Sequence, residues 1–292
     1  MATATGNYVH DNSSLANFKN WAMSISQALA AFGWIQTADS GQVNWSSIAS
    51  VPNNAYVYEV WKANDAQAAT LPIFLRLEYG YHATTVRIRA TVGTGSDGAG
   101  NITGVVTNAP WQLTYTESNN GATIYPCYFS GDAGEFRMYL WQTQSAWTGT
   151  IFIIERAKDS LGSKTAEYFT ALNMMSGGYC QYKQQTVFSA TLLAPLLWTS
   201  GNTNALPAAV TTGISTGTWN GKTSAFPCFP VYGQVGNPFL GLVVVYLGDT
   251  ADGALVTVAS MYGATHSYVV AKGNAFNTVC ASGNFCAAMR YE

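Results

Sequence analysis

Apolar residues recur with a helical period near the start of the chain. Within residues 14–32 they fall on one side of a helix, at Leu15, Phe18, Trp21, Ala22, Ile25, Ala28, Leu29 and Phe32. Ser13 or Ser14 can cap the first turn, and Gly33 can end the helix in the left-handed conformation. The pattern therefore predicts one amphipathic helix whose apolar stripe packs on the core.

After Gly33 the pattern changes to short runs of aromatic and β-branched residues separated by Gly, Asn, Asp and Pro. In one of them Val86, Ile88 and Ala90 alternate with Arg87 and Arg89, which is the period of a half-buried strand. The runs predict strands over residues 42–45, 56–63, 72–81, 84–93, 110–117 and 135–143, two strands joined by a turn at 159–164 within 150–173, and two or three strands within 238–273.

This order of elements predicts a fold that is mainly β, with an N-terminal α-helix and antiparallel, β-sandwich-like domains. We expect an N-terminal domain over residues 1–155, holding the helix and the first strands, and a C-terminal β domain over 156–292. The boundary is expected anywhere between residues 150 and 200.

One segment, "TVGTGSDGAGNITG" at residues 91–104, contains the pattern G-x-G-x-x-G at Gly93, Gly95 and Gly98. A dinucleotide-binding loop with this pattern must lead from a strand into a helix, whose first amides hold the pyrophosphate. Here a strand precedes the glycines, but the residues that follow are polar, Gly-rich and then strand-like. We therefore interpret the segment as a wide turn whose glycines supply positive φ angles, and we expect no nucleotide cofactor.

Charge is sparse in this sequence. Charged residues make up 10% of the chain, against a usual share of about a quarter, and the net charge is −2. Such a balance does not favour nucleic acid or an anionic membrane as a partner. Soluble monomers usually carry a mixed, charged surface, so we expect this surface to be buried against other subunits; a surface rich in Ser, Thr, Asn and Gly is the alternative.

Residues that could carry chemistry do not form a recognisable constellation. "GISTG" at residues 213–217 fits the G-x-S-x-G pattern of hydrolases, but no helix can follow it. The three histidines are far apart and lack metal-ligand spacing. Four glutamates on predicted strands, Glu59, Glu78, Glu135 and Glu155, are interpreted as solvent-facing or salt-bridged residues. We predict no catalytic residues, no metal and no cofactor, and hence no enzyme.

Two further features leave alternatives open. Cys280 and Cys286 are close enough in the sequence for a small disulfide loop, and buried or unbridged thiols are the other interpretation. The chain also has nine Trp and 17 Tyr residues, which can bind sugars or protein partners. No secretory signal and no run of about 20 apolar residues is found, so a membrane-spanning segment is not expected.

Several segments together resemble a group of virion proteins of tailed bacteriophages. The first is "FKNWAMSISQALAAFGWIQTADSGQVNW", which begins with Phe18 and Trp21 in an F-x-x-W pattern; "YEVWKANDAQAATLPIFLRLEYG" and "ATVGTGSDGAGNITG" follow it. The run "IFIIERAKDSLGSKTAE" and the C-terminal "PFLGLVVVYLGD" also resemble segments of this group, whereas the middle of the chain matches poorly. The resemblance implies a particle component made in the bacterial cytoplasm and located in the virion.

From the resemblance and the composition, we expect a structural protein of a tailed phage that forms a symmetric oligomer. The neck, collar or tail is the expected position, where the protein can anchor fibres or spikes. The alternatives are a capsid decoration protein and a carbohydrate-binding receptor protein that contacts host glycans. Its partners are then itself and other virion proteins, and the candidate interface residues are Phe18, Trp21, Gly93, Gly95 and Gly98.

Overall fold

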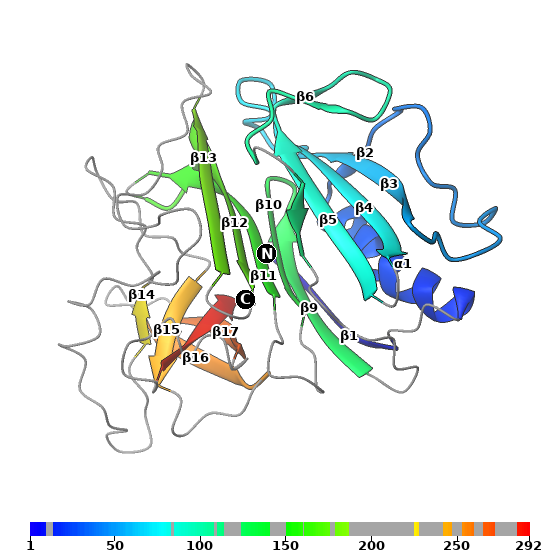
Figure 1. The fold of residues 1–292 in the computed structure, drawn as a ribbon. Helices are drawn as coiled ribbons and strands as arrows, with labels where there is room; N and C mark the ends of the chain where they lie inside the picture. Colours follow the sequence, from blue (N-terminus) through cyan, green and yellow to red (C-terminus); the bar gives the residue numbers. More distant parts are fainter. Residues whose placement is uncertain are drawn as a thin grey trace.

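A computed structural model describes residues 1–9, 14–82, 85–107, 110–113, 124–140, 150–159, 161–175, 179–186, 225–227, 242–246, 253–259, 265–271 and 285–292. These residues form antiparallel β-sheets and one helix, α1 (Leu15–Ala31), which confirms the predicted fold class (Figure 1).

The helix has the predicted ends. The Ser14 side chain accepts a hydrogen bond from the backbone N–H of Asn17 at 3.2 Å, as expected of an N-cap residue. Gly33 follows the C-cap with φ of +93°, a conformation that glycine adopts at little cost. The apolar stripe, including Phe18, Trp21 and Ile25, is buried in the main core of the protein, as predicted.

Among the described residues, three sheets and one small ribbon make up the β structure. The N-terminal sheet has five strands in the order β2 (Ile35–Gln36), β3 (Ala55–Lys62), β4 (Phe74–His82), β5 (Thr85–Gly93) and β8 (Trp111–Gln112). A two-stranded ribbon, β6 (Gly95–Ser96) and β7 (Ile102–Thr103), follows β5.

The six-stranded sheet has the order β1 (Ala2–Val9), β9 (Ile124–Asp132), β10 (Glu135–Leu140), β11 (Thr150–Lys158), β12 (Lys164–Met175) and β13 (Tyr179–Thr186). The C-terminal sheet has the order β14 (Ala225–Pro227), β15 (Leu242–Tyr246), β18 (Phe285–Arg290), β17 (Thr265–Ala271) and β16 (Leu255–Ala259).

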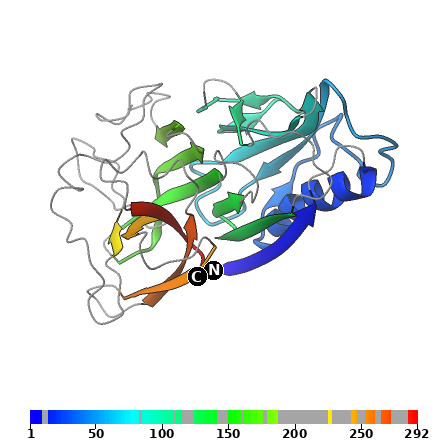
Figure 2. The same cartoon turned by 60° about the horizontal axis from the view of Figure 1, so that its bottom comes forward.

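The six-stranded sheet lies between the other layers (Figures 1 and 2). One of its faces is apolar and packs, through residues such as Phe136 and Phe152, in the same core as α1 and the inner face of the N-terminal sheet. The other face meets the C-terminal sheet, where the Ser130 hydroxyl donates a hydrogen bond to the carbonyl oxygen of Arg290 at 2.7 Å. The two faces follow from strict alternation along β10, because Phe136 and Met138 point to the core while Glu135 and Arg137 point away from it.

Residues 155 and 156, between which the two predicted domains would meet, lie within β11, which is paired with β10 on one side and β12 on the other. The boundary range of residues 150–200 stays a prediction. The strand predicted at residues 42–45 does not form: residues 42–44 are irregular, and a turn begins at Trp45, where the Asn44 side chain accepts a hydrogen bond from the backbone N–H of Ser46. The strands expected over 110–117 and 135–143 are described over 111–112 and 135–140 only.

Candidate functional site

The glycine-rich segment forms a hairpin at one end of the N-terminal sheet, where β6 pairs with β7. The side chain of Asp97 shapes its turn, since its Oδ1 accepts hydrogen bonds from the N–H groups of Ala99 and Asn101 at 2.8 and 3.0 Å. The side chain of Asn101 donates a further hydrogen bond to Asp97. This bond first, and then the two backbone bonds, lowers the pKa of Asp97 below its usual value. No helix follows the glycines in the described chain, so the segment lacks the geometry of a dinucleotide-binding loop.

A second aspartate fastens this hairpin to the segment after α1. Asp39 accepts hydrogen bonds from the Ser96 hydroxyl and, at 3.0 Å, from the backbone N–H of Gly100. Partial burial raises the pKa of Asp39, but these hydrogen bonds outweigh it and lower the value overall. The backbone of Ser40 adds a hydrogen bond to the carbonyl of Gly98 at 2.9 Å, so the hairpin is held at its tip.

The hairpin also lies over the outer face of the N-terminal sheet. The hydroxyl of Tyr58 is 2.7 Å from the carbonyl oxygen of Ser40 and 3.2 Å from that of Ala99. Arg76 donates from Nη1 to the carbonyl of Gly100 at 2.8 Å. Gly100 has no space for a side chain, because a Cβ would stand 2.4 Å from the Tyr58 ring.

The three candidate glycines are required for two different reasons. Gly98 has φ of +79°, as predicted for a wide turn. Gly93 and Gly95 do not have positive φ, which corrects our explanation for them. They are crowded instead: a Cβ on Gly93 would lie 2.6 Å from the carbonyl oxygen of Thr103, and one on Gly95 would lie 2.5 Å from the Thr103 hydroxyl.

Arginine and tyrosine side chains share the outer face of this sheet. The guanidinium of Arg76 lies over the Tyr58 ring at 4.1 Å, and that of Arg89 lies over the Tyr56 ring at 3.6 Å. Between them, Glu78 accepts an ion pair from each arginine at 3.1 Å. We call the six side chains Tyr56, Tyr58, Arg76, Glu78, Arg87 and Arg89 the outer-face patch.

The inner face of the same sheet holds a buried carboxyl group. Glu59 is 2% exposed and accepts hydrogen bonds from Trp45 Nε1 at 2.8 Å, from Trp61 Nε1 at 3.3 Å and from the Tyr79 hydroxyl at 3.3 Å, as well as from Ser26 of α1. Burial, and next the charge of Glu59, raise the pKa of Tyr79 well above its ordinary value. Phe18 packs on Trp45 with ring centroids 6.2 Å apart, which ties α1 to this cluster.

Several residues of the first segment that resembles the phage proteins, residues 18–45, make contacts that stabilise the fold. Trp34 donates from Nε1 to the carbonyl of Asp132 at 3.0 Å and so anchors the six-stranded sheet. Gln42 donates to the carbonyl of Thr37 at 2.7 Å and accepts from the backbone N–H of Val60 at 2.7 Å. These contacts, with those of Asp39 and Trp45, explain residues whose spacing alone predicts no chemistry.

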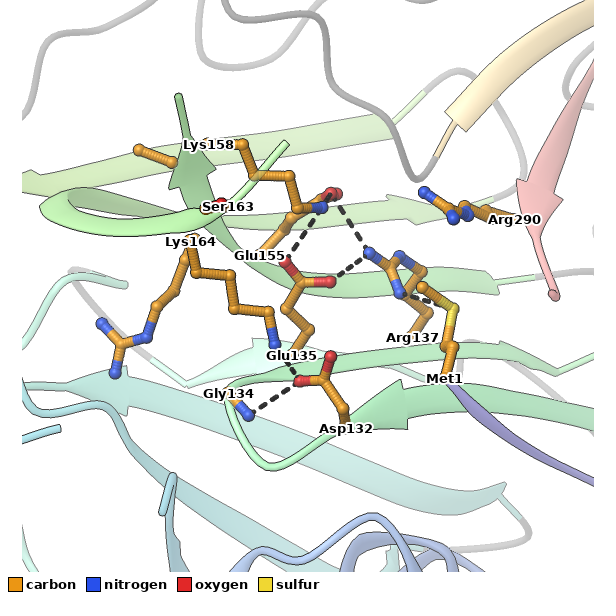
Figure 3. Close-up of polar contacts among 12 residues, drawn as sticks. Met1, Asp132, Gly134, Glu135, Arg137, Glu155, Lys158, Ser163, Lys164 and Arg290 are labelled. Carbon is orange, nitrogen blue, oxygen red and sulfur yellow. Dashed lines mark hydrogen bonds and ion pairs between the residues drawn. The ribbon is translucent and has the colours of Figure 1, made fainter. Parts of the chain in front are cut away.

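A buried ionic cluster lies on the face of the six-stranded sheet that points away from the main core (Figure 3). Arg137 donates from Nη2 to Glu135 at 2.6 Å and to Glu155 at 3.1 Å, and Lys158 bridges the same carboxylates at 3.0 and 2.6 Å. A register shift in β11 between Arg156 and Lys158 brings Lys158 to the face of Glu155. The four charges cancel, which is the condition under which a buried cluster is tolerated.

The electrostatics of this cluster favour the charged forms of Glu135 and Arg137. Burial alone would raise the pKa of Glu135, but Arg137 and Lys158 lower it to about 2. Burial would lower the pKa of Arg137, but Glu155 and Glu135 raise it above its usual value. A carboxylate with so low a pKa stays ionised near neutral pH, so Glu135 acts there as an acceptor for Arg137 and Lys158.

None of the four glutamates singled out in the sequence faces the solvent. All four are buried; Glu78, Glu135 and Glu155 are salt-bridged, as one of our interpretations required, while Glu59 is held by neutral donors. In the described part of the chain, no three His, Cys, Asp or Glu side chains are grouped so that they could hold a metal.

Among the predicted interface residues, Phe18 and Trp21 are 1% and 2% exposed inside the core, so their side chains do not reach the surface of the chain. Gly93 is buried, and Gly98 lies at the exposed tip of the hairpin. Cys280 lies outside the described residues, as does the side chain of Cys286, and residues 213–217 lie outside them too.

A comparison with models of known protein families finds no match, and a search of characterised proteins finds no similar sequence. Within the described residues, α1 is neither long nor apolar enough to cross a membrane.

Proposed function

We propose that this protein is a structural component of a tailed bacteriophage particle, which assembles as a symmetric oligomer and has no catalytic role. The neck, collar or tail is its proposed position, and a place on the capsid surface would use the same properties. The location in the virion is part of this proposal and rests on the sequence resemblance.

The observation that carries the proposal is how few charges the protein presents to solvent. The sequence has only 13 basic and 15 acidic residues. At least six of these are buried within the described residues, namely Glu59, Glu78, Glu135, Glu155, Arg137 and Arg156. A surface so poor in charge is prone to association, which suits a subunit whose surface is covered by neighbours.

Two further features support a structural role. The buried carboxyl groups of Glu59, Glu78 and Glu135 are each bound by donors of the same chain, which supports a role of these charges in the fold. The hairpin is pinned by Asp39, Tyr58 and Arg76, which makes it a firm surface feature of the kind that a rigid neighbour can contact.

A receptor that binds sugars needs open aromatic rings. On the outer-face patch, Tyr56 and Tyr58 each have one ring face covered by a guanidinium. This observation does not favour sugar stacking there, so we keep the structural role as the proposal.

Antibodies raised against the purified chain test the proposal on particles. The particles are purified on a density gradient from lysates of cells that carry the sequence, and gold-labelled antibody is followed by electron microscopy. We expect labelling at one defined position on intact tailed particles. Antigen that stays in the soluble fraction, with unlabelled particles, would show that the protein is not a virion component.

A further inference from the structure

The charges of the outer face of the N-terminal sheet are separated along the strands. At one end stand Arg87 and Arg89, both on β5 and both partly exposed. Arg89 shares Glu78 with Arg76, and no ion pair of Arg87 is found among the described residues. The N-terminal end of β5 is therefore basic.

The other end of this face carries the hairpin and is acidic. Asp97 is exposed at the hairpin tip, and Asp39 lies beneath it; neither makes an ion pair with any described residue. Their hydrogen bonds come from neutral donors, which fix the carboxylates without cancelling their charge. The tip overlies this same face, because Ala99 and Gly100 rest on Tyr58.

Arg87 and the root of the hairpin lie at opposite ends of β5, while the hairpin tip folds back onto Tyr58 and Arg76. The hairpin begins directly after Gly93, at the far end of β5 from Arg87 (Figure 1). At roughly 3.3 Å per residue, Arg87 and Gly93 stand about 20 Å apart along the strand. In between, Glu78 forms ion pairs with both Arg76 and Arg89, so the face has a basic end at Arg87, a centre of paired charges and an acidic end at the hairpin.

A face with this polarity is complementary to itself after a half-turn. In a two-fold contact, residue i of one copy meets residue j of the other and the reverse contact follows by symmetry. Turning a second copy by 180° places its acidic hairpin over the basic end of the first. Tyr and Arg, which supply the rest of this patch, are the residue types enriched at protein interfaces.

We propose that two copies of this chain pair through the outer faces of their N-terminal sheets, with Asp97 of each copy against Arg87 and Arg89 of the other. This inference rests on the proposed self-assembly and names the surface and the partner for it. The guanidinium of Arg89 is held in place by the Tyr56 ring and by its ion pair with Glu78, so a second carboxylate can bind it at low entropic cost.

A charge-swap experiment tests the pairing. Sedimentation equilibrium gives the dissociation constant of the wild type, of Arg87→Glu, of Asp97→Lys and of the double variant. We expect each single reversal to raise the dissociation constant at least about tenfold, and higher salt to weaken the wild-type contact. The double variant should return to within about threefold of wild type, because the pair is restored with opposite polarity.

Lys19→Glu is the matched control, since it reverses a charge on α1, away from this face, and should leave the dissociation constant unchanged. Asp97→Lys also disturbs the hairpin turn, so rescue by Arg87→Glu separates lost pairing from a lost turn. An oligomer that is insensitive to both single reversals, or a double variant no better than the worse single one, would overturn the pairing and leave the proposed assembly standing. A wild-type monomer at every concentration would overturn the assembly as well.

Discussion

The indole N–H of Trp45 donates a hydrogen bond to the carboxyl group of Glu59 at 2.8 Å. Trp45 is the last residue of the first segment that resembles the phage proteins, residues 18–45, and Glu59 lies on β3, so the bond ties the turn after α1 to the core face of the N-terminal sheet. Ser26 and Phe18 of α1 reach the same two residues. One buried carboxyl group thus joins a helix, a turn and a sheet.

Replacing Glu59 by Leu should be strongly destabilising. The substitution removes the acceptor of the buried Trp61 and Tyr79 donors and of the partly buried Trp45 donor, and we expect the free energy of unfolding to fall by about 3 kcal/mol. Urea denaturation followed by tryptophan fluorescence measures the change. Glu167→Leu, at an exposed position of β12, is the control and should cost less than about 0.5 kcal/mol. Equal effects of the two changes would mean that the donors do not depend on Glu59.

The ionic cluster predicts a non-additive pair of substitutions. Arg137→Met leaves Glu135 and Glu155 with only Lys158 between them, and we expect a loss of about 3–5 kcal/mol. Adding Glu135→Leu removes one of the two buried carboxylates that have lost Arg137, and it should restore part of that stability. If the double variant loses more free energy of unfolding than the two single variants lose together, the charges of the cluster do not compensate one another as described.

The hairpin glycines should respond differently to substitution. Gly93→Ala places a Cβ against the backbone oxygen of Thr103, so the strand must shift, and we expect a loss above about 2 kcal/mol. Gly98 has open space around it and only its positive φ to satisfy, so Gly98→Asn should cost less than about 1 kcal/mol. Thermal unfolding of both variants provides the comparison. A Gly98 variant that is the less stable of the two would contradict this ranking.

Stability should decline in acid, and Glu135 should contribute to the decline. Its pKa is about 2 in the folded protein against an ordinary value of 4.5, so its contribution is complete above pH 4.5 and is lost as the pH falls from 4.5 towards 2. The free energy of unfolding, measured across this window, should fall less steeply for Glu135→Gln than for wild type. Parallel curves for the two proteins would show that Glu135 does not titrate in this way.

The sequence predicts the helix and most strands of the described chain because their patterns are local. The stripe from Phe18 to Leu29 and its caps at Ser14 and Gly33 are determined by neighbouring residues. The alternation of Ile88 and Ala90 with Arg89 likewise predicts which face of β5 is buried. Strands β1, β9, β13 and β18 were not predicted; in β1 the short Ala and Thr side chains give little periodicity, and this strand forms by pairing with β9.

The polar clusters could not be predicted in this way, because their members meet only after folding. Asp39 contacts Gly100, and Arg156 contacts Asp65 at 2.5 Å, each across a long stretch of chain. A glutamate on a strand can face water, another sheet or a buried donor, and its neighbours in the sequence do not distinguish these cases. One feature of the sequence does point to buried charge. The chain has few charged residues, yet several of them stand on otherwise apolar strands.

The mass of the purified protein in solution, measured by light scattering after size exclusion, tests the proposed assembly most directly. We predict a closed oligomer with a mass that is a multiple of 31.2 kDa and holds over a range of protein concentrations. A single species of 31.2 kDa at every concentration would contradict self-assembly.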